Sequence, residues 1–411
     1  FLAKILYFFT KSFAVSFSIL GGIAVFFIIY FLLKILEVNP QSLPGLLLSG
    51  IVFFNPLFWL MSNRYMPDLF GLALAISSFY CLSDERKHKN ILLGFLFTGL
   101  LAGVRLSYLP ILIVPFCYNF FNNKNKIYFV SIFSLGCIVW LIPLVWVTGI
   151  DNLINAAAKQ TQGHFADFGG TIITENNWWK RFLMIIRSIW SDGLGGYWVG
   201  RSWQTLILSL PMIYILYSGI KELKVQKKKN SISIYISFGI VYAIWIFFFQ
   251  NVLHKSRHIL PLLVPLFVIL HSGLLFINKK KNMLNTLLLI IFFTSTINIT
   301  TNLILQHKKP NAISSVKNAI LKKGFQFPIA STPLINYYLQ QHGLENEFLD
   351  IESDEDIHAI KLSGDREIFL IGNFKKQFLS DYYIISDSTY YHNPYVNRMW
   401  SEINTYFLEK K

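Results

Sequence analysis

Long apolar stretches recur along almost the whole first three quarters of this 411-residue chain, and they constrain its fold more than any other feature. A hydrocarbon core about 30 Å thick is crossed by about 20 apolar helical residues, so stretches of this length predict membrane-spanning helices. With 54% hydrophobic and only 14% charged residues, the composition excludes an ordinary water-soluble domain. We predict an α-helical polytopic membrane protein with about ten spans, at residues 12–36, 43–61, 67–83, 91–106, 108–121, 127–149, 204–221, 231–250, 259–277 and 283–305.

The net charge of +15 is explained by membrane topology rather than by a nucleic-acid partner. If the ten spans alternate in direction, thirteen basic residues between them fall on one side: Arg86, Lys87, Lys89, Lys124, Lys126, Lys221, Lys224, Lys227, Lys228, Lys229, Lys279, Lys280 and Lys281. The short loops of the other side hold only Arg64, Arg105, Lys255 and Arg257. Because cytoplasmic loops carry the excess of Lys and Arg, we place these four residues on the extracytoplasmic side and expect no nucleic acid to bind.

Two regions interrupt the membrane pattern. The outer loop 150–203 contains a segment, residues 178–190, that combines Trp and apolar residues with three cations and predicts a helix at the membrane interface. After residue 305 the apolar runs shrink to strand length, at 327–331, 347–351, 367–372 and 382–386, and alternate with helical patterns at 311–323, 333–342 and 394–409. We therefore expect a multispanning domain at 1–305 and a small soluble extracytoplasmic α/β domain at 306–411, which we interpret as a docking or acceptor-recognition module.

Asp68 is the first candidate for chemistry. It opens an apolar helix just after the short polar turn 62–67, in a chain otherwise built for lipid. A carboxylate is costly to keep in such surroundings, which indicates a functional role. The structural alternative is that Asp68 caps its helix, because an anion is favoured at a helix N-terminus.

Cations gather at the same boundary of the membrane. The candidate binding residues are Arg64, Arg105, Lys255, Arg257 and His258. The planar fork of Arg can bind two phosphate oxygens at once, so a carboxylate beside these groups fits a substrate with a lipid tail and a phosphate head. The alternative for Lys255 and Arg257 is that they only reach toward lipid headgroups.

His164 lies in a glycine-containing loop, residues 160–171, together with Asp167 and two Phe residues. This composition is typical of a tight, aromatic-lined binding loop, although a surface His is more often inert. One His and one Asp are too few for a metal site, so we expect no metal site and leave a divalent cation as an open alternative.

Several strings, in this order, resemble the membrane-embedded C-fold glycosyltransferases, in particular the branch of the protein O-mannosyltransferases and the lipid A aminoarabinose transferases. They are NPLFW at 55–59, DLFG at 68–71, GLLAGVRLSYLP at 99–110, GHF at 163–165, GGT at 169–171 and RHILPLLVP at 257–265. The resemblance covers roughly residues 1–305. It implies transfer of a sugar from a polyprenyl-phosphate donor to an acceptor hydroxyl of a protein, lipid or glycan on the extracytoplasmic face of the membrane.

In that family an acid in the first outer loop is regarded as the catalytic base, and a second acid opens a later helix. Asp68 matches the second acid, whereas the first has no counterpart because no Asp or Glu precedes Glu37. We therefore expect a helix and a loop with an acid upstream of Phe1. The roles assigned here are Asp68 to orient or deprotonate the acceptor or to coordinate a cation, Arg257 and Lys255 to hold the donor phosphate, Arg105 to support the anionic site, and His164 to contact donor or acceptor.

The chemistry of glycosyl transfer fits these residue types. A sugar hydroxyl is a poor nucleophile, so a carboxylate must take its proton as the new bond forms, and cations already in place stabilise the departing phosphate. Two alternatives remain open: a transporter or flippase of lipid-linked glycans, which predicts ionisable residues near the membrane midplane, and a glycan polymerase or ligase. We expect an integral protein of a bacterial inner membrane.

Overall fold

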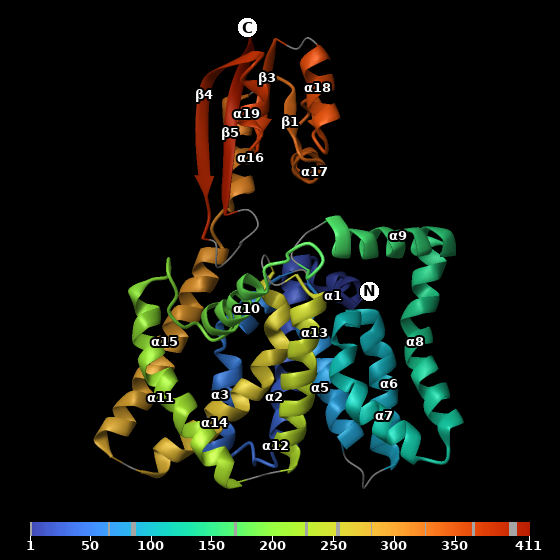
Figure 1. Cartoon of the computed structure of the whole chain (residues 1–411), viewed down its shortest axis with the longest axis vertical. Helices are drawn as coiled ribbons and strands as arrows, with labels where there is room; N and C mark the ends of the chain where they lie inside the picture. The colour runs from blue at the N-terminus through green and yellow to red at the C-terminus, as the bar shows by residue number, and fades with distance from the viewer. Residues whose placement is uncertain are drawn as a thin grey trace. The chain divides into compact units, whose positions relative to one another are not determined.

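The computed structural model describes residues 2–64, 66–83, 88–167, 171–226, 229–251, 255–280, 282–324, 326–363, 366–393 and 401–411. The chain divides into two compact units, Phe1–Asn302 and Leu303–Lys411 (Figure 1). The division lies three residues before the boundary expected at 305. The first unit is helical and the second contains a small sheet.

The helices of the first unit, of which α15 runs past the division, are α1 (Leu2–Thr10), α2 (Phe13–Ile35), α3 (Leu43–Phe53), α4 (Pro56–Ser62), α5 (Asp68–Ser83), α6 (His88–Arg105), α7 (Ile113–Asn122), α8 (Lys126–Thr148), α9 (Ile150–Gln162), α10 (Trp178–Arg187), α11 (Trp203–Gln226), α12 (Lys229–Ile234), α13 (Tyr242–Phe249), α14 (Leu263–Lys279) and α15 (Met283–His307). Five short segments with tighter or wider helical turns complete the first unit. Two are 3₁₀-helices, η1 (Leu106–Leu112) and η5 (Ser256–Leu262), and three are π-helices, η2 (Gly163–Asp167), η3 (Ser188–Gly193) and η4 (Tyr235–Val241).

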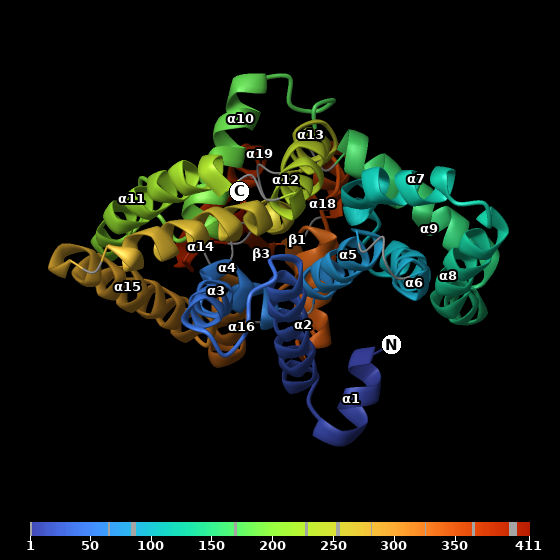
Figure 2. The ribbon, with the colours of Figure 1, turned by 90° about the horizontal axis from the view of Figure 1, so that it is seen from below.

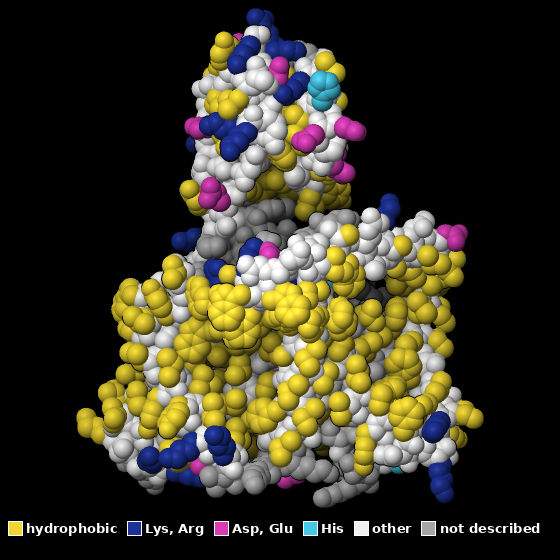
Figure 3. All heavy atoms as spheres, in the orientation of Figure 1, with side chains coloured by type: hydrophobic (Ala, Val, Ile, Leu, Met, Phe, Trp, Pro, Cys, Tyr) yellow, Lys and Arg dark blue, Asp and Glu magenta, His cyan; other side chains and the backbone are white. Residues whose placement is uncertain are grey.

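Seven of the described helical stretches are long and apolar enough to cross a membrane, which supports a multi-pass membrane protein. The number becomes eight if α3 and α4, bent by 58° at their junction, form one span. The expected count of about ten is not confirmed. Residues predicted as two spans, 91–106 and 108–121, belong to one stretch, His88–Asn122, and α5 is shorter than the others. Figure 3 shows the broad apolar surface of this unit, with Lys and Arg side chains along its lower edge.

Helix α14 together with η5 forms the centre of the first unit, and 78% of the apolar segment within Ser256–Lys279 is buried. Figure 2 shows α14 between α11 and α3. The backbones of α11 and α14 approach closely because Gly219 and Gly273 have no side chains at the contact. A Cβ atom on Gly219 would lie 2.0 Å from the carbonyl oxygen of Ile269, and one on Gly273 would lie 2.0 Å from the carbonyl oxygen of Ile215. Small residues are the usual means of packing helices in a membrane, where the hydrophobic effect between helices is weak.

Several helices begin where the sequence supplies a cap. Ser12, Ser42 and Asn55 stand before α2, α3 and α4, and each side chain accepts a hydrogen bond from a backbone amide three residues later. Asn177 caps α10 in the same way. The predicted interfacial helix is thus formed as α10, but it ends at Arg187 and continues as the π-helix η3.

The second unit is an α/β fold with helices on both faces of a five-stranded sheet. Its elements are α16 (Ala312–Lys323), β1 (Ile329–Ser331), α17 (Pro333–Gln341), β2 (Phe348–Asp350), α18 (Asp354–Ser363), β3 (Glu367–Ile371), α19 (Lys375–Phe378), β4 (Tyr382–Tyr391) and β5 (Glu402–Lys410). The strand order is β2-β1-β3-β5-β4. Strands β2, β1 and β3 are parallel, and β5 runs antiparallel to both of its neighbours, β3 and β4. Alternate residues of β3 enter different cores: Ile368 and Leu370 pack with α18, whereas Phe369 and Ile371 pack with α16 and α17.

One predicted element of this unit is wrong. The pattern at 394–409 predicted a helix, but Glu402–Lys410 form strand β5, and 394–400 lie outside the described residues. Ile403, Thr405 and Leu408 are buried along this strand, which pairs with β3 on one side and with β4 on the other. Pairing with the preceding strand β4 and with β3 overrides a weak local helical pattern.

Candidate functional site

Asp68 is fully buried in the first turn of α5. The preceding residue, Pro67, starts the helix, and its carbonyl oxygen accepts a hydrogen bond from the amide of Gly71 at 2.8 Å. Neither carboxylate oxygen of Asp68 accepts an aligned hydrogen bond from any residue that the structure describes. Capping of α5 is therefore not observed, and the carboxylate is held for another reason.

Arg105 faces Asp68. Its Nη2 atom lies 2.9 Å from Oδ1 of Asp68, a close ion pair that is not aligned as a hydrogen bond. Arg105 ends α6 and leaves helical geometry, with φ −154° and ψ 81°, before η1 begins. Gly71, one turn after Asp68, permits the approach, because a Cβ atom there would lie 2.7 Å from Cβ of Arg105.

His258 is the second partner of Arg105, whose Nη2 atom lies 3.2 Å from Nδ1 of the imidazole. A guanidinium has only donors, so Nδ1 must accept, and the ring is neutral with its proton on Nε2. His258 is 5% exposed and lies on η5. We therefore describe His258 as a neutral acceptor for Arg105, whereas the sequence grouped it with the cations.

Arg105 and Lys255 occupy equivalent local positions. Each has an extended, non-helical backbone and is followed directly by a 3₁₀-helix that contains a proline, Pro110 in η1 and Pro261 in η5. Proline cannot donate a backbone hydrogen bond, which helps to prevent a regular α-helix from forming there. Both breaks thereby place a charged side chain at the end of an apolar segment.

Arg257 and Arg64 complete the surroundings of Asp68. The guanidinium of Arg257 contacts the sulfur atom of Met66, two residues before Asp68. Burial lowers the pKa of the Arg64 guanidinium, the nearby charge of Arg257 lowers it further, and Asp68 opposes both effects. The pKa of the Lys255 ammonium is lowered by partial burial and by the charges of Arg257 and Arg105. Among the described residues, Asp68 thus interacts with three arginines, and Lys255 interacts with two of them, Arg105 and Arg257.

Two buried tyrosines lie against this cluster. The rings of Tyr108 and Tyr242 meet edge to face at 5.7 Å between centroids, and the Arg105 guanidinium lies 5.7 Å from the centre of the Tyr108 ring. The Tyr242 hydroxyl donates to the backbone carbonyl of His258 at 2.9 Å. The hydroxyl of Tyr108 is buried and interacts with the side chain of Arg105. Tyr108 stood in a string that carried the resemblance, whereas nothing in the sequence pointed to Tyr242.

His164 is anchored at the end of α13. Its Nε2 atom lies 2.7 Å from the carbonyl oxygen of Phe249, and its ring packs edge-on against Phe165 at 4.9 Å. His164 is within electrostatic range of His258. Residues 168–170 of the predicted binding loop and the side chain of Asp167 lie outside the described residues.

Among the described residues, no group of three or more His, Cys, Asp or Glu side chains is placed to hold a metal ion. The negative charge of Asp68 interacts with the guanidinium groups of Arg64, Arg105 and Arg257.

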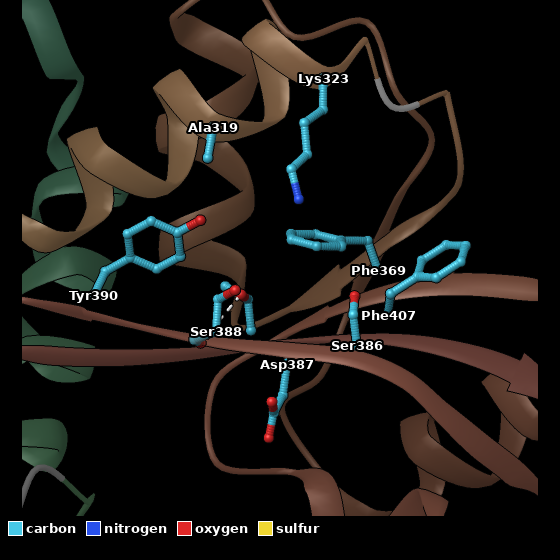
Figure 4. Close-up of a pocket in the computed structure, with 9 residues that line it drawn as sticks. Ala319, Lys323, Phe369, Ser386, Asp387, Ser388, Tyr390 and Phe407 are labelled. Atoms are coloured by element: carbon cyan, nitrogen blue, oxygen red, sulfur yellow. Dashed lines mark hydrogen bonds between the residues drawn. The ribbon is translucent and has the colours of Figure 1, made fainter.

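The second unit contains a small pocket of about 10 Å³, a volume that holds about one water molecule. Its lining residues come from α16, β3, β4 and β5 and include Lys323, Phe369, Ser386, Tyr390 and Thr405. Figure 4 shows the side chains of Lys323 and Tyr390 directed toward this hollow, while that of Asp387 points away from it. The pocket is too small to receive a sugar or a phosphate group in this conformation.

A scan of protein-family models and a search of curated proteins found no match to this chain.

Proposed function

We propose that the protein is a glycosyltransferase that moves a sugar from a polyprenyl-phosphate donor to an acceptor hydroxyl on the extracytoplasmic face of a bacterial inner membrane. The observation that carries the proposal is the charge of the cluster. Arg64, Arg105 and Arg257 interact electrostatically with one carboxylate, Asp68, and Lys255 interacts with Arg105 and Arg257. Burial is the main cause of the lowered pKa values of Arg64 and Lys255, and the neighbouring cations add to it. Buried charge of one sign requires compensation, and a phosphate group supplies it.

The proposed reaction assigns a task to each group. The acceptor oxygen forms a bond to the anomeric carbon, the bond from that carbon to the phosphate oxygen breaks, and the electron pair leaves with the polyprenyl phosphate. Asp68 orients the acceptor hydroxyl or takes up its proton. Arg257 and Lys255 stabilise the charge on the departing phosphate, and Arg105 holds Asp68 in place.

The position of the charges favours a transferase over a transporter or flippase. Asp68 begins α5 and Lys255 precedes η5, so these two residues lie at the ends of apolar helices, while Arg105 lies at the break between α6 and η1. A transporter site is more often found near the membrane midplane, between broken helices. A polymerase or ligase would use the same class of carrier, and the identity of the donor separates it from the proposed enzyme.

The test is transfer by the full-length protein in lipid, followed by thin-layer analysis of which radiolabelled polyprenyl-linked sugar is consumed. We expect Asp68→Asn to abolish transfer while membrane insertion stays intact. The matched control is Asp151→Asn, since Asp151 is exposed in the first turn of α9. Undiminished transfer by Asp68→Asn would remove this carboxylate from the mechanism, and consumption of a diphosphate-linked oligosaccharide would favour the polymerase or ligase.

A further inference from the structure

A second buried polar cluster lies in the segment that joins α10 to α11, apart from Asp68 and its cations. Its members are Arg187, Ser188, Ser191, Asp192 and Arg201. Ser188 and Ser191 are each 0% exposed, yet neither hydroxyl has a hydrogen-bond partner among the residues that the structure describes. The Nε atom of Arg187 is also buried and has no hydrogen-bond partner among these residues. Buried polar atoms are nearly always hydrogen-bonded, so these three atoms are available to bind a ligand.

The wide turn of η3 explains why the two hydroxyls are available. A serine in an α-helix commonly donates to the carbonyl one turn earlier, as Ser77 donates to the carbonyl of Ala73 at 2.7 Å. Ser188 and Ser191 lie in the π-helix η3 and make no such bond. Short π-helical segments within helices occur frequently at functional sites.

The surroundings hold η3 firmly in place. The side-chain amide of Asn55 donates to the carbonyl of Gly193 at 2.7 Å, which fixes η3 to the start of α4. Gly193 also packs closely on η5 and α14, because a Cβ atom there would lie 3.0 Å from Ile259 and 2.7 Å from Leu263. Since η5 also carries Arg257 and His258, the serine cluster and the Asp68 site border the same element.

The chemistry of the cluster favours a neutral ligand rich in hydroxyls. Asp192 pairs with Arg201 at 3.3 Å, and both side chains are 5% exposed, so this pair adds no net charge. The hydroxyl, guanidinium and carboxylate groups together offer both donors and acceptors. Sugar hydroxyls need both kinds of partner.

We propose that Ser188 and Ser191, with Arg187 and the Asp192–Arg201 pair, form a subsite that binds the hydroxyl groups of a saccharide. This proposal rests on the proposed function. The saccharide in the subsite is the sugar of either the donor or the acceptor, bound on the side of η5 that faces η3.

Binding to the full-length protein in lipid nanodiscs tests the subsite without requiring transfer. One arm compares undecaprenyl phosphate with the same carrier bearing mannose, glucose or aminoarabinose; the other uses a panel of methyl pyranosides. We expect Ser188→Ala/Ser191→Ala to weaken saccharide binding about tenfold, since two hydrogen bonds are lost, while bare undecaprenyl phosphate binds as before. An effect in the first arm assigns the subsite to the donor sugar, and an effect in the second assigns it to the acceptor.

The matched control is Ser77→Ala, which removes a buried serine hydroxyl that is bonded within its own helix. Because the hydroxyls of Ser188 and Ser191 are unpaired in the free protein, their loss is expected to leave Tm unchanged or higher. Equal binding by the double variant and the wild type would overturn the subsite, as would a wild type that binds no saccharide in either arm or a double variant with a clearly lower Tm. Failure of the subsite and failure of the enzyme remain distinguishable, because transfer by Asp68→Asn tests the enzyme separately.

Discussion

Nη2 of Arg105 lies 2.9 Å from Oδ1 of Asp68, joining the end of α6 to the start of α5. The pair is buried on the carboxylate side, where Asp68 is 1% exposed by side chain, and partly open on the side of Arg105, at 19%. A buried ion pair contributes little net stability when complete, but removing one partner leaves an uncompensated charge. The contact therefore sets the charge state of the site more than it stabilises the fold.

We expect Arg105→Gln to destabilise the protein by about 3–5 kcal/mol, because Asp68 would stay buried without its partner. The double variant Asp68→Asn/Arg105→Gln is expected to lose less than the two single variants combined. The free energy of unfolding in detergent micelles measures both effects. Lys180→Gln is the control, since the Lys180–Glu175 pair lies at the surface and its loss is expected to change the stability little. Strictly additive losses would show that Arg105 and Asp68 do not interact.

Gly71→Ala is expected to push Arg105 away from Asp68. The new methyl group would lie 2.7 Å from Cβ of Arg105 and 3.5 Å from the ring of Tyr108, so η1 must shift, at a cost of about 1–3 kcal/mol. We expect transfer to fall at least tenfold. Gly22→Ala in α2 is the control, because nothing lies within 4 Å of its added Cβ atom. Equal activities of the two variants would mean that the close approach of α5 and Arg105 has no functional role.

The affinity for the donor is expected to fall at alkaline pH. Partial burial and the charges of Arg257 and Arg105 lower the pKa of Lys255, so its ammonium loses the proton at a lower pH than an ordinary lysine. Only the protonated form attracts phosphate, so binding is strong below this pKa and weakens as pH rises through it. The dissociation constant of undecaprenyl phosphate, measured against pH, reports the change. Lys255→Arg should move the loss to higher pH; an unchanged profile in that variant would assign the titration to another group.

Arg181 is expected to hold α10 on the end of α13. Its side chain is 1% exposed, its Nε atom donates to the carbonyl of Phe247 at 2.9 Å and Nη2 donates to that of Gln250 at 3.1 Å. Cations are favoured at a helix C-terminus, so Arg181→Met loses both the bonds and the charge. We expect faster hydrogen exchange of α10 by mass spectrometry, with little effect from Phe182→Ala, because Phe182 is exposed. Unchanged exchange in Arg181→Met would show that apolar contacts alone hold α10.

Much of the fold follows from local sequence. Apolar length predicts spans, and the caps Ser12, Ser42 and Asn55 stand where helices begin. The count of spans does not follow, because residues 91–106 and 108–121, predicted as two spans, belong to one helical stretch that continues through the break at Arg105. Strand β5 was predicted as a helix. Its conformation is decided by pairing with β3 and β4 in the sheet, and the local sequence of residues 402–410 does not reveal this pairing.

The sequence by itself determined the class of protein and the residues of the candidate site, because burying charge in an apolar chain is costly enough for Asp68, Arg105, Arg257 and Lys255 to stand out. Only the tertiary structure decided how they are joined. Side chains on α5, α6 and η5 meet because Gly71 gives Arg105 room to approach and η5 brings His258 to the same guanidinium. Such contacts depend on the packing of helices far apart in the chain, and no local pattern specifies them.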